Sequence, residues 1–170
     1  MAMIRSGSYL FIVLLILIFI SCGGKKELSQ SEANEFEELK SLVEQRKFEI
    51  VNDFANPSIG NRINLIGNPN YLRFNKDSVD IFLPFFGTRN FGGSYGREGG
   101  IKFTGAPTNL TITEEPSKSR MIIGFKGSQD GEILDFIITL FDNNTSNTSV
   151  NSSQRSNISY QGEVSELDEN

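Results

Sequence analysis

The chain has 170 residues and a net charge of −5, because 21 acidic residues outnumber 16 basic ones. It contains no histidine, no tryptophan and a single cysteine. These absences exclude Ser-His-Asp and Cys-His catalysis and the usual zinc sites, which need His or Cys ligands. No stretch is basic enough to bind nucleic acid. We therefore predict no nucleic-acid partner, no metal and no cofactor, and we assign no catalytic residues.

The N-terminus has the pattern of a bacterial lipoprotein signal. Arg5 precedes a short apolar run from Tyr9 to Ile20, which ends just before Cys22. A membrane-spanning helix needs about 20 apolar residues, so this run is short for an anchor and suits a signal peptide. We predict a signal peptide over residues 1–21, acylation of the Cys22 thiol and a flexible tether over residues 22–27. An uncleaved signal anchor is the alternative.

Lipidation at Cys22 determines the expected location of the protein. Two or three acyl chains bury enough methylene groups for stable anchoring, whereas a single chain does not. The acidic body is not expected to lie flat on anionic lipid. The membrane is thus a predicted partner through acylated Cys22. The predicted location is the outer membrane, facing the periplasm, with exposure at the cell surface as an alternative.

Residues 28–164 are predicted to form a single β-rich domain that begins with a helix, and residues 165–170 a frayed acidic tail. The helix is expected between Lys25 and Lys47, where apolar residues recur at helical spacing. This stripe comprises Ala33, Phe36, Leu39, Leu42 and Val43. We expect the stripe to dock on the sheet of the same chain, and a partner-binding face is the alternative.

From Phe48 onward the hydrophobic period changes to two, which is typical of half-buried strands. The alternating groups are Phe48/Ile50, Ile63/Leu65, Leu72/Phe74, Val79/Ile81/Leu83, Ile101/Phe103, Leu110/Ile112, Met121/Ile123/Phe125, Ile133–Phe141, Thr148/Val150 and Ile158/Tyr160. Turn residues separate them, and a hairpin loop is predicted over residues 127–131. The expected fold is mainly β: an antiparallel meander closing into a barrel-like or sandwich domain, with one N-terminal amphipathic helix.

Two of these strands carry more specific predictions. The strand over Ile133–Phe141 is apolar on both faces, so we expect one face in the interior and the other beneath the N-terminal helix. The first face comprises Leu134, Phe136, Ile138 and Leu140, and the second Ile133, Ile137 and Phe141. Residues 143–153 are rich in Asn, Ser and Thr, which predicts a polar turn followed by an edge strand.

The stretch from Pro84 to Gly100 has the composition of a ligand-binding loop. Its glycines let a backbone approach a ligand closely, and its aromatic side chains supply stacking area. Long loops without secondary structure are usually functional or disordered. The candidate ligands are a small hydrophobic molecule, a glycan or a protein, and a structural loop packed by its own aromatic residues is the alternative. The predicted ligand-binding residues are Phe85, Phe86, Arg89, Tyr95 and Arg97.

Carboxylates are scattered along the chain and leave a hydrolase open. A glycosidase needs two of them facing each other across roughly 5–9 Å. Spacing in the sequence does not pair any two. We expect most of them to lie on solvated strand faces. The candidates are Asp53, Asp80, Glu98, Glu114, Glu115, Asp135, Asp142 and Glu163.

Several short segments together resemble the Bacteroidetes family of unknown function DUF4251. These segments are Ile63-Asn64-Leu65, Asp77-Ser78-Val79, Leu83-Pro84-Phe85-Phe86-Gly87, Gly99-Gly100-Ile101-Lys102-Phe103 and Ser159-Tyr160-Gln161-Gly162. The resemblance covers roughly residues 38–164. It implies an exported, often lipid-anchored envelope protein with a β-rich domain, and it implies no activity and no catalytic residues.

The primary hypothesis is a lipid-anchored, non-enzymatic binding or scaffolding module of the cell envelope. Its ligand is expected at the barrel end near Phe85, Phe86 and Tyr95, in an apolar pocket. The first alternative is a small carboxylate-dependent hydrolase acting on envelope glycan or peptidoglycan, which requires two facing buried acids. The second is a stress-linked structural lipoprotein without a ligand, which requires a solid core and a flat surface.

Overall fold

A computed structural model describes residues 30–89 and 99–168 of the chain. Every alternating group that was predicted overlaps a strand. The elements are α2 (Gln30–Gln45), β1 (Lys47–Pro57), β2 (Ile63–Asn64), β3 (Tyr71–Asn75), β4 (Ser78–Leu83), β5 (Ile101–Gly105), β6 (Thr108–Glu115), η1 (Pro116–Lys118), β7 (Arg120–Gln129), β8 (Glu132–Phe141), β9 (Thr145–Ser152) and β10 (Ile158–Glu166).

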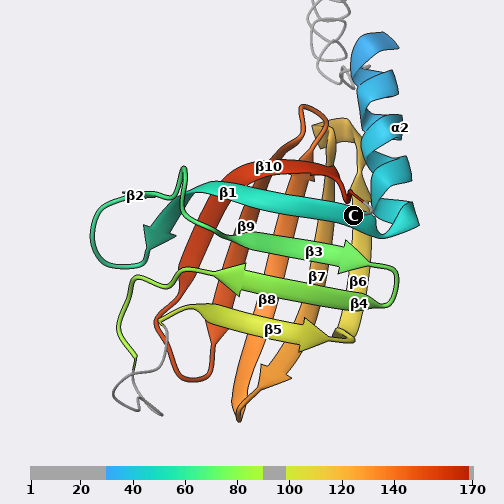
Figure 1. The fold of residues 1–170 in the computed structure, drawn as a ribbon. Coiled ribbons are helices and arrows are strands. Elements are labelled where there is room, and N and C mark those ends of the chain that lie inside the picture. The colour runs from blue at the N-terminus through green and yellow to red at the C-terminus, as the bar shows by residue number, and fades with distance from the viewer. Residues whose placement is uncertain (1–29, 90–98, 169–170) are drawn as a thin grey trace, which may run out of the picture.

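The strands form one antiparallel sheet in the order β5-β4-β3-β1-β10-β9-β8-β7-β6, with β2 added on β1. Two meanders, β3 to β5 and β6 to β10, are joined because β1 pairs with β10. In Figure 1 strands β1, β3, β4 and β5 run across strands β6 to β9, so the sheet curls into a half-barrel. The predicted mainly β architecture with one N-terminal helix is confirmed.

A row of phenylalanine rings crosses the interior of the half-barrel. Phe48 stacks on Phe74 at 4.7 Å between ring centres, and Phe74 meets Phe125 edge-on at 5.5 Å. Phe125 in turn stacks on Phe136 at 4.8 Å. Because the first two rings come from β1 and β3 and the last two from β7 and β8, the row ties the two halves of the sheet together.

Helix α2 covers the open side of this interior. Phe36, Leu39 and Val43 are buried in the same apolar cluster as the inner-face residues of the strands. Lys40 of the helix pairs with Glu114 of β6 at 3.0 Å. The predicted docking of the apolar stripe on the chain's own sheet is confirmed. In the described part of the chain, no helix combines the length and the apolar character needed to span a membrane.

The helix does not cover the second face of β8, contrary to the prediction. Ile133 and Ile137 remain 55% and 45% exposed, whereas Phe136 and Ile138 are fully buried. The reason is that α2 packs over the inner face of the half-barrel, the face that already buries Phe136. The outer face of β8 therefore stays in contact with solvent.

Strand β9 lies between β8 and β10, so the prediction of an edge strand there is wrong. Ser146, Thr148 and Val150 alternate inward and are buried. The hydroxyl oxygens of Ser146 and Thr148 have no hydrogen-bond partner among the described residues. The polar composition of this segment therefore does not indicate an edge strand, because small hydroxyl side chains also fit on the buried inner face of the sheet.

The turn between β7 and β8 is tighter than predicted. Asp130 and Gly131 alone form it, with φ angles of 51° and 78°, as expected for a two-residue hairpin turn. Gly127 lies within β7 and faces Phe103 of β5. A Cβ atom at Gly127 would lie 2.7 Å from the Phe103 ring, so glycine there lets the edge strand β5 pack closely against β7.

The sheet also extends further toward the C-terminus than predicted. Ser165 and Glu166, assigned to the acidic tail, belong to β10 and pair with Glu49 and Phe48 of β1. The first and last strands are thus paired side by side, which ties down both ends of the domain.

Candidate functional site

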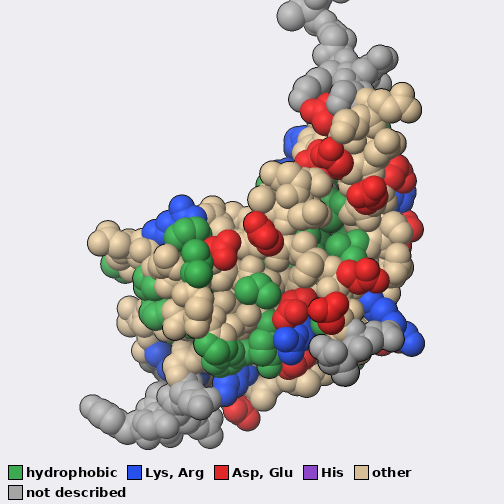
Figure 2. Space-filling view, turned by 45° about the horizontal axis from the view of Figure 1, so that its top comes forward, with side chains coloured by type: hydrophobic (Ala, Val, Ile, Leu, Met, Phe, Trp, Pro, Cys, Tyr) green, Lys and Arg blue, Asp and Glu red, His purple; other side chains and the backbone are tan. Residues whose placement is uncertain are grey.

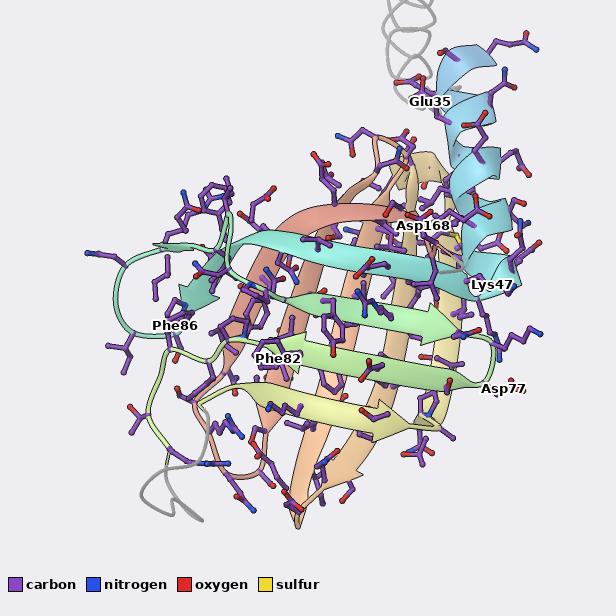
Figure 3. The ribbon with its side chains drawn as sticks, in the orientation of Figure 1. Glu35, Lys47, Asp77, Phe82, Phe86 and Asp168 are labelled. Atoms are coloured by element: carbon purple, nitrogen blue, oxygen red, sulfur yellow. The ribbon has the colours of Figure 1, made fainter. Side chains whose placement is uncertain are left out.

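An open groove lies on the outer side of the sheet, next to the end of β4. It has a volume of about 480 Å³, within the range of ligand pockets. We call it the Phe86 groove, since the Phe86 side chain is 38% exposed there. Figure 3 shows Phe86 on the opposite side of the molecule from Asp77 and away from Glu35, with Phe82 between Phe86 and Asp77. The lining residues are Ile63, Asn64, Leu65, Asn68, Pro69, Phe82, Pro84 and Phe86.

A pair of buried amides holds one wall of the groove. The Oδ1 atom of Asn70 accepts a hydrogen bond from the Asn52 backbone N–H at 2.8 Å, and its Nδ2 atom donates to the Asn52 carbonyl at 2.9 Å. The Asn70 side chain thus replaces a backbone rung between β1 and the β2–β3 loop. The Leu65 N–H donates to the Asp53 carbonyl at 2.7 Å, at the point where the register of β1 shifts.

The polar side chains in the groove are both amides. No acidic or basic side chain of the described residues lines it. The Oδ1 atom of Asn64 accepts a hydrogen bond from the Ile66 N–H at 2.8 Å. Neither the Asn64 amide nitrogen nor the Asn68 side chain is bonded to another part of the described chain. The groove therefore combines apolar walls with available amide groups.

A smaller hollow of about 300 Å³ adjoins the groove and shares Phe82 with it. Cations lie over the two aromatic rings there: the Lys102 ammonium is 5.2 Å from the Phe82 ring centre, and the Arg73 guanidinium is 4.1 Å from that of Tyr71. Burial, followed by the charge and hydrogen bond of Asp80, raises the pKa of Tyr71, so its hydroxyl stays protonated. The lining residues are Tyr71, Asp80, Ile81, Phe82, Lys102 and Thr104.

A buried cluster of charged residues, which we call the arginine clamp, comprises Arg89, Glu132 and Arg155. Arg89 lies only a few residues after Phe86 in the chain. Glu132 accepts hydrogen bonds from Arg155 through both carboxylate oxygens, at 2.7 and 2.9 Å. The Arg89 Nη2 atom lies 3.3 Å from the same carboxylate. Arg155 also donates to the Gly100 carbonyl at 3.0 Å. The clamp thereby ties Arg89 and Gly100 to β8 and to the β9–β10 turn.

The arginine clamp keeps Glu132 ionised. Burial raises the pKa of Glu132, but hydrogen bonds from Arg155 and Ser152 and the charges of Arg155 and Arg89 outweigh that effect. The pKa of Glu132 consequently lies below its ordinary value of 4.5. A glycosidase acid needs the opposite shift. Glu132 therefore fits a structural ion pair and not a proton donor.

The predicted ligand-binding residues lie in different environments. Phe86 lines the groove. Phe85 packs against the core, with the Arg155 guanidinium 5.2 Å from its ring centre. Arg89 belongs to the arginine clamp. Outside the described residues lie Tyr95, Arg97 and the predicted lipidation site Cys22.

Most of the groove was not assigned from the sequence. Its other lining residues were interpreted as parts of strands or turns. One signal was available: Ile66 directly follows Leu65, and two adjacent apolar residues before a turn cannot both face the core. Leu65 is buried and Ile66 is 66% exposed. The break in alternation therefore marks the place where apolar surface reaches solvent.

The carboxylates give no support for a metal centre. Within residues 30–89 and 99–168, no group of three or more His, Cys, Asp or Glu residues is arranged to hold a metal ion. Glu114, Glu115 and Asp135 each pair with a lysine or arginine side chain. Figure 2 shows acidic side chains along α2 and on the surface beneath it, where they face solvent.

The fold and the groove define a mainly β half-barrel domain with one helix and an external apolar groove. The family described as "Domain of unknown function (DUF4251)" matches residues 30–164, which is most of the chain. The chain belongs to the DUF4251 family, as its short segments predicted. Comparison with curated proteins gave no match.

The fold is similar to the crystal structure of a DUF4251 family protein from Bacteroides eggerthii DSM 20697. The TM-score is 0.61 at 14% sequence identity, over 81% of this chain and 92% of that chain. At this identity the similarity concerns the fold alone.

Proposed function

We propose that the protein is a non-enzymatic binding module of the bacterial cell envelope and that the Phe86 groove holds its ligand. The observation that carries this proposal is the open apolar groove itself, with Phe86 exposed on its wall. Ile66, which follows the lining residue Leu65, adds apolar surface that is also in contact with solvent. Clustered exposed apolar side chains of this kind mark binding sites.

The proposal includes an outer-membrane anchor at acylated Cys22, with the domain facing the periplasm. Seven residues lie between Cys22 and Gln30, so eight residue steps place the anchor within about 28 Å of the start of α2. Helix α2 and the Phe82–Phe86 end of the sheet lie on different sides of the molecule (Figure 3). This arrangement supports a groove that points away from the anchoring membrane.

Native mass spectrometry of envelope-purified protein tests the groove. Three forms are compared: wild type, Phe86→Ser and Ile133→Ser. Ile133 is the matched control, because it is 55% exposed on the outer face of β8 and does not line the groove. We expect a co-purified ligand on the wild type and on Ile133→Ser and none on Phe86→Ser. A wild type without ligand, or a Phe86→Ser variant that retains it, would refute the proposal.

Fractionation of a Cys22→Ser variant tests the anchor. We expect the variant to leave the membrane fraction and to lack the mass of the acyl chains. A variant with the same fractionation and the same mass as the wild type would contradict lipidation.

A carboxylate-dependent hydrolase acting on envelope glycan or peptidoglycan has less support. Glu132 is the one buried carboxylate among the residues that the structure describes. Two arginines pair with it and keep it ionised. Because no second carboxylate of the described residues is buried, the facing pair of buried acids that a hydrolase requires is not formed among them. Scaffolding without a ligand is the remaining alternative, and an empty groove in native mass spectrometry would favour it.

A further inference from the structure

The Phe86 groove lies where the described strands leave a position in the sheet unfilled. Strand β1 pairs with β3 over Lys47–Ile50 and with β2 over Phe54–Ala55. Among the described strands, β2 pairs with β1 alone. The other edge of Ile63–Asn64 therefore has none of the described strands beside it. The groove extends from this edge to Pro84 and Phe86. An open strand edge beside an apolar pocket is the arrangement that accepts an added strand.

The lining of the groove fits an uncharged peptide. The amides of Asn64 and Asn68 offer donors and acceptors, which match the C=O and N–H groups of a peptide backbone. A charged ligand would lose its hydration without gaining an ion pair, because the described lining carries no charged side chain. A large apolar side chain of the ligand would instead contact Leu65, Phe82 and Phe86.

A sugar or an acyl chain fits this surface less well. Sugars commonly lie against an aromatic ring, and of the two rings that line the groove Lys102 is already positioned over Phe82, which leaves Phe86 alone. An acyl chain needs most of its surface enclosed. The groove is open to solvent on the outer side of the sheet, so it would leave such a chain largely exposed.

We infer, on the basis of the proposed function of the groove, that its ligand is an extended, uncharged peptide segment of another protein. This segment adds as a strand along Ile63–Asn64 and places one large apolar side chain in the Phe86 groove. Backbone hydrogen bonds to β2 supply affinity, and the apolar pocket supplies selectivity for the side chain.

Hydrogen–deuterium exchange of the purified protein tests strand addition, because an added strand protects the backbone amides of β2. The probes are a capped hexapeptide alternating leucine and serine, the same peptide with glutamate in place of leucine, the tetrasaccharide of N-acetylglucosamine, and phosphatidylethanolamine vesicles. We expect the leucine peptide to slow exchange over residues 63–66 in a saturable manner. The glutamate peptide should bind at least about tenfold more weakly.

Three variants make the assignment specific. Phe86→Ser should weaken binding of the leucine peptide by about tenfold or more. Asn64→Asp keeps the oxygen that accepts from Ile66 but removes the amide donor, and it should weaken binding by about threefold to tenfold. Ile133→Ser, which alters an exposed isoleucine away from the groove, should leave binding within about twofold of the wild type.

The outcomes separate the two proposals. If the tetrasaccharide or the vesicles bind in a manner that depends on Phe86 and the leucine peptide does not, the peptide assignment is overturned and the proposed function stands. The assignment is also overturned if Phe86→Ser and Ile133→Ser bind the peptide equally well. If no probe binds and the envelope-purified protein carries no ligand, both proposals fail.

Discussion

Phe86 and Arg89 are close neighbours in the chain, yet their environments are opposite. Phe86 is partly exposed in an uncharged apolar groove. Arg89 enters the arginine clamp, where Glu132 and Arg155 are buried and paired in a bidentate arrangement. Removing one partner from the clamp leaves a buried charge unpaired. The apolar side chains of the groove, in contrast, are in contact with solvent and become buried only when a ligand covers them.

The comparison shows that the composition of a loop does not identify which of its residues bind. Phe85 has the same side chain as Phe86 but packs against the core. The Tyr160 hydroxyl donates to the Pro84 carbonyl at 2.8 Å, and burial raises the pKa of Tyr160 so that the hydroxyl stays protonated. Partners and burial, not residue type, therefore distinguish the structural part of this segment from the part available to a ligand.

The largest expected effect on stability comes from the arginine clamp. Glu132→Ala should lower the free energy of unfolding by about 3–5 kcal/mol, because it leaves buried arginine without its carboxylate. Urea unfolding followed by circular dichroism measures this loss. The matched control is Asp135→Ala on the same strand, which breaks a half-exposed pair with Lys126 at 3.7 Å and should cost less than about 1 kcal/mol. Similar losses in the two variants would contradict a structural role for the clamp.

The amide support of the groove wall predicts an intermediate effect. Asn70→Ala removes the buried hydrogen bonds to the Asn52 backbone and should cost about 1–3 kcal/mol. Asn68→Ala, in the same loop, should cost little stability, because the exposed Asn68 side chain makes no hydrogen bond to another described residue. Urea unfolding of both variants gives the comparison. If Asn70→Ala is no more harmful than Asn68→Ala, the amide pair is not what holds the wall.

The pH dependence of the free energy of unfolding tests the clamp through protonation of Glu132, without removal of its side chain. Because the pKa of Glu132 is lowered below 4.5 in the folded protein, its contribution is present above that pH and is lost as the pH falls through the folded value. Between about pH 5 and pH 3, the unfolding free energy of the wild type should therefore fall more steeply than that of Glu132→Gln. Parallel curves would show that protonation of Glu132 does not drive the loss.

The groove side predicts the smallest effect on stability. Phe86→Ser should change the free energy of unfolding by less than about 1 kcal/mol, because the side chain is partly exposed and outside the core. Phe136→Ala, a buried counterpart in the phenylalanine row, should cost about 3–5 kcal/mol. Differential scanning calorimetry on both variants checks the contrast. A large loss of unfolding free energy in Phe86→Ser would show that Phe86 belongs to the structural core.

Much of the fold was predictable because alternation and burial coincide. Inner-face residues such as Phe136 and Ile138 follow the predicted period, and the α2 stripe docks as expected. Strand β9 was misassigned because Ser146 and Thr148 are polar yet buried. The exposed face of β8 was also misassigned, since periodicity identifies two apolar faces without saying which one another element will cover.

Less of the site was predictable, because pairing across the sheet creates it. The groove joins the β2–β3 loop to the end of β4, and β2 meets β1 through contacts that spacing along the chain does not reveal. The arginine clamp likewise joins Arg89 to Glu132 and Arg155, which lie far along the chain. The composition of the segment from Pro84 to Gly100 predicted a binding loop. It did not show which of its residues line the groove and which belong to the clamp or the core.

Ligand binding in the Phe86 groove is tested most directly by measuring ligand occupancy and melting temperature together, in wild-type and Phe86→Ser protein purified from the envelope in parallel. We expect Phe86→Ser to lose the bound ligand, while the melting temperature of its ligand-free form stays within about 4 °C of the ligand-free wild type. Retention of the ligand by Phe86→Ser, or a fall in its melting temperature of more than about 10 °C, would contradict the assignment of the Phe86 groove as the binding surface.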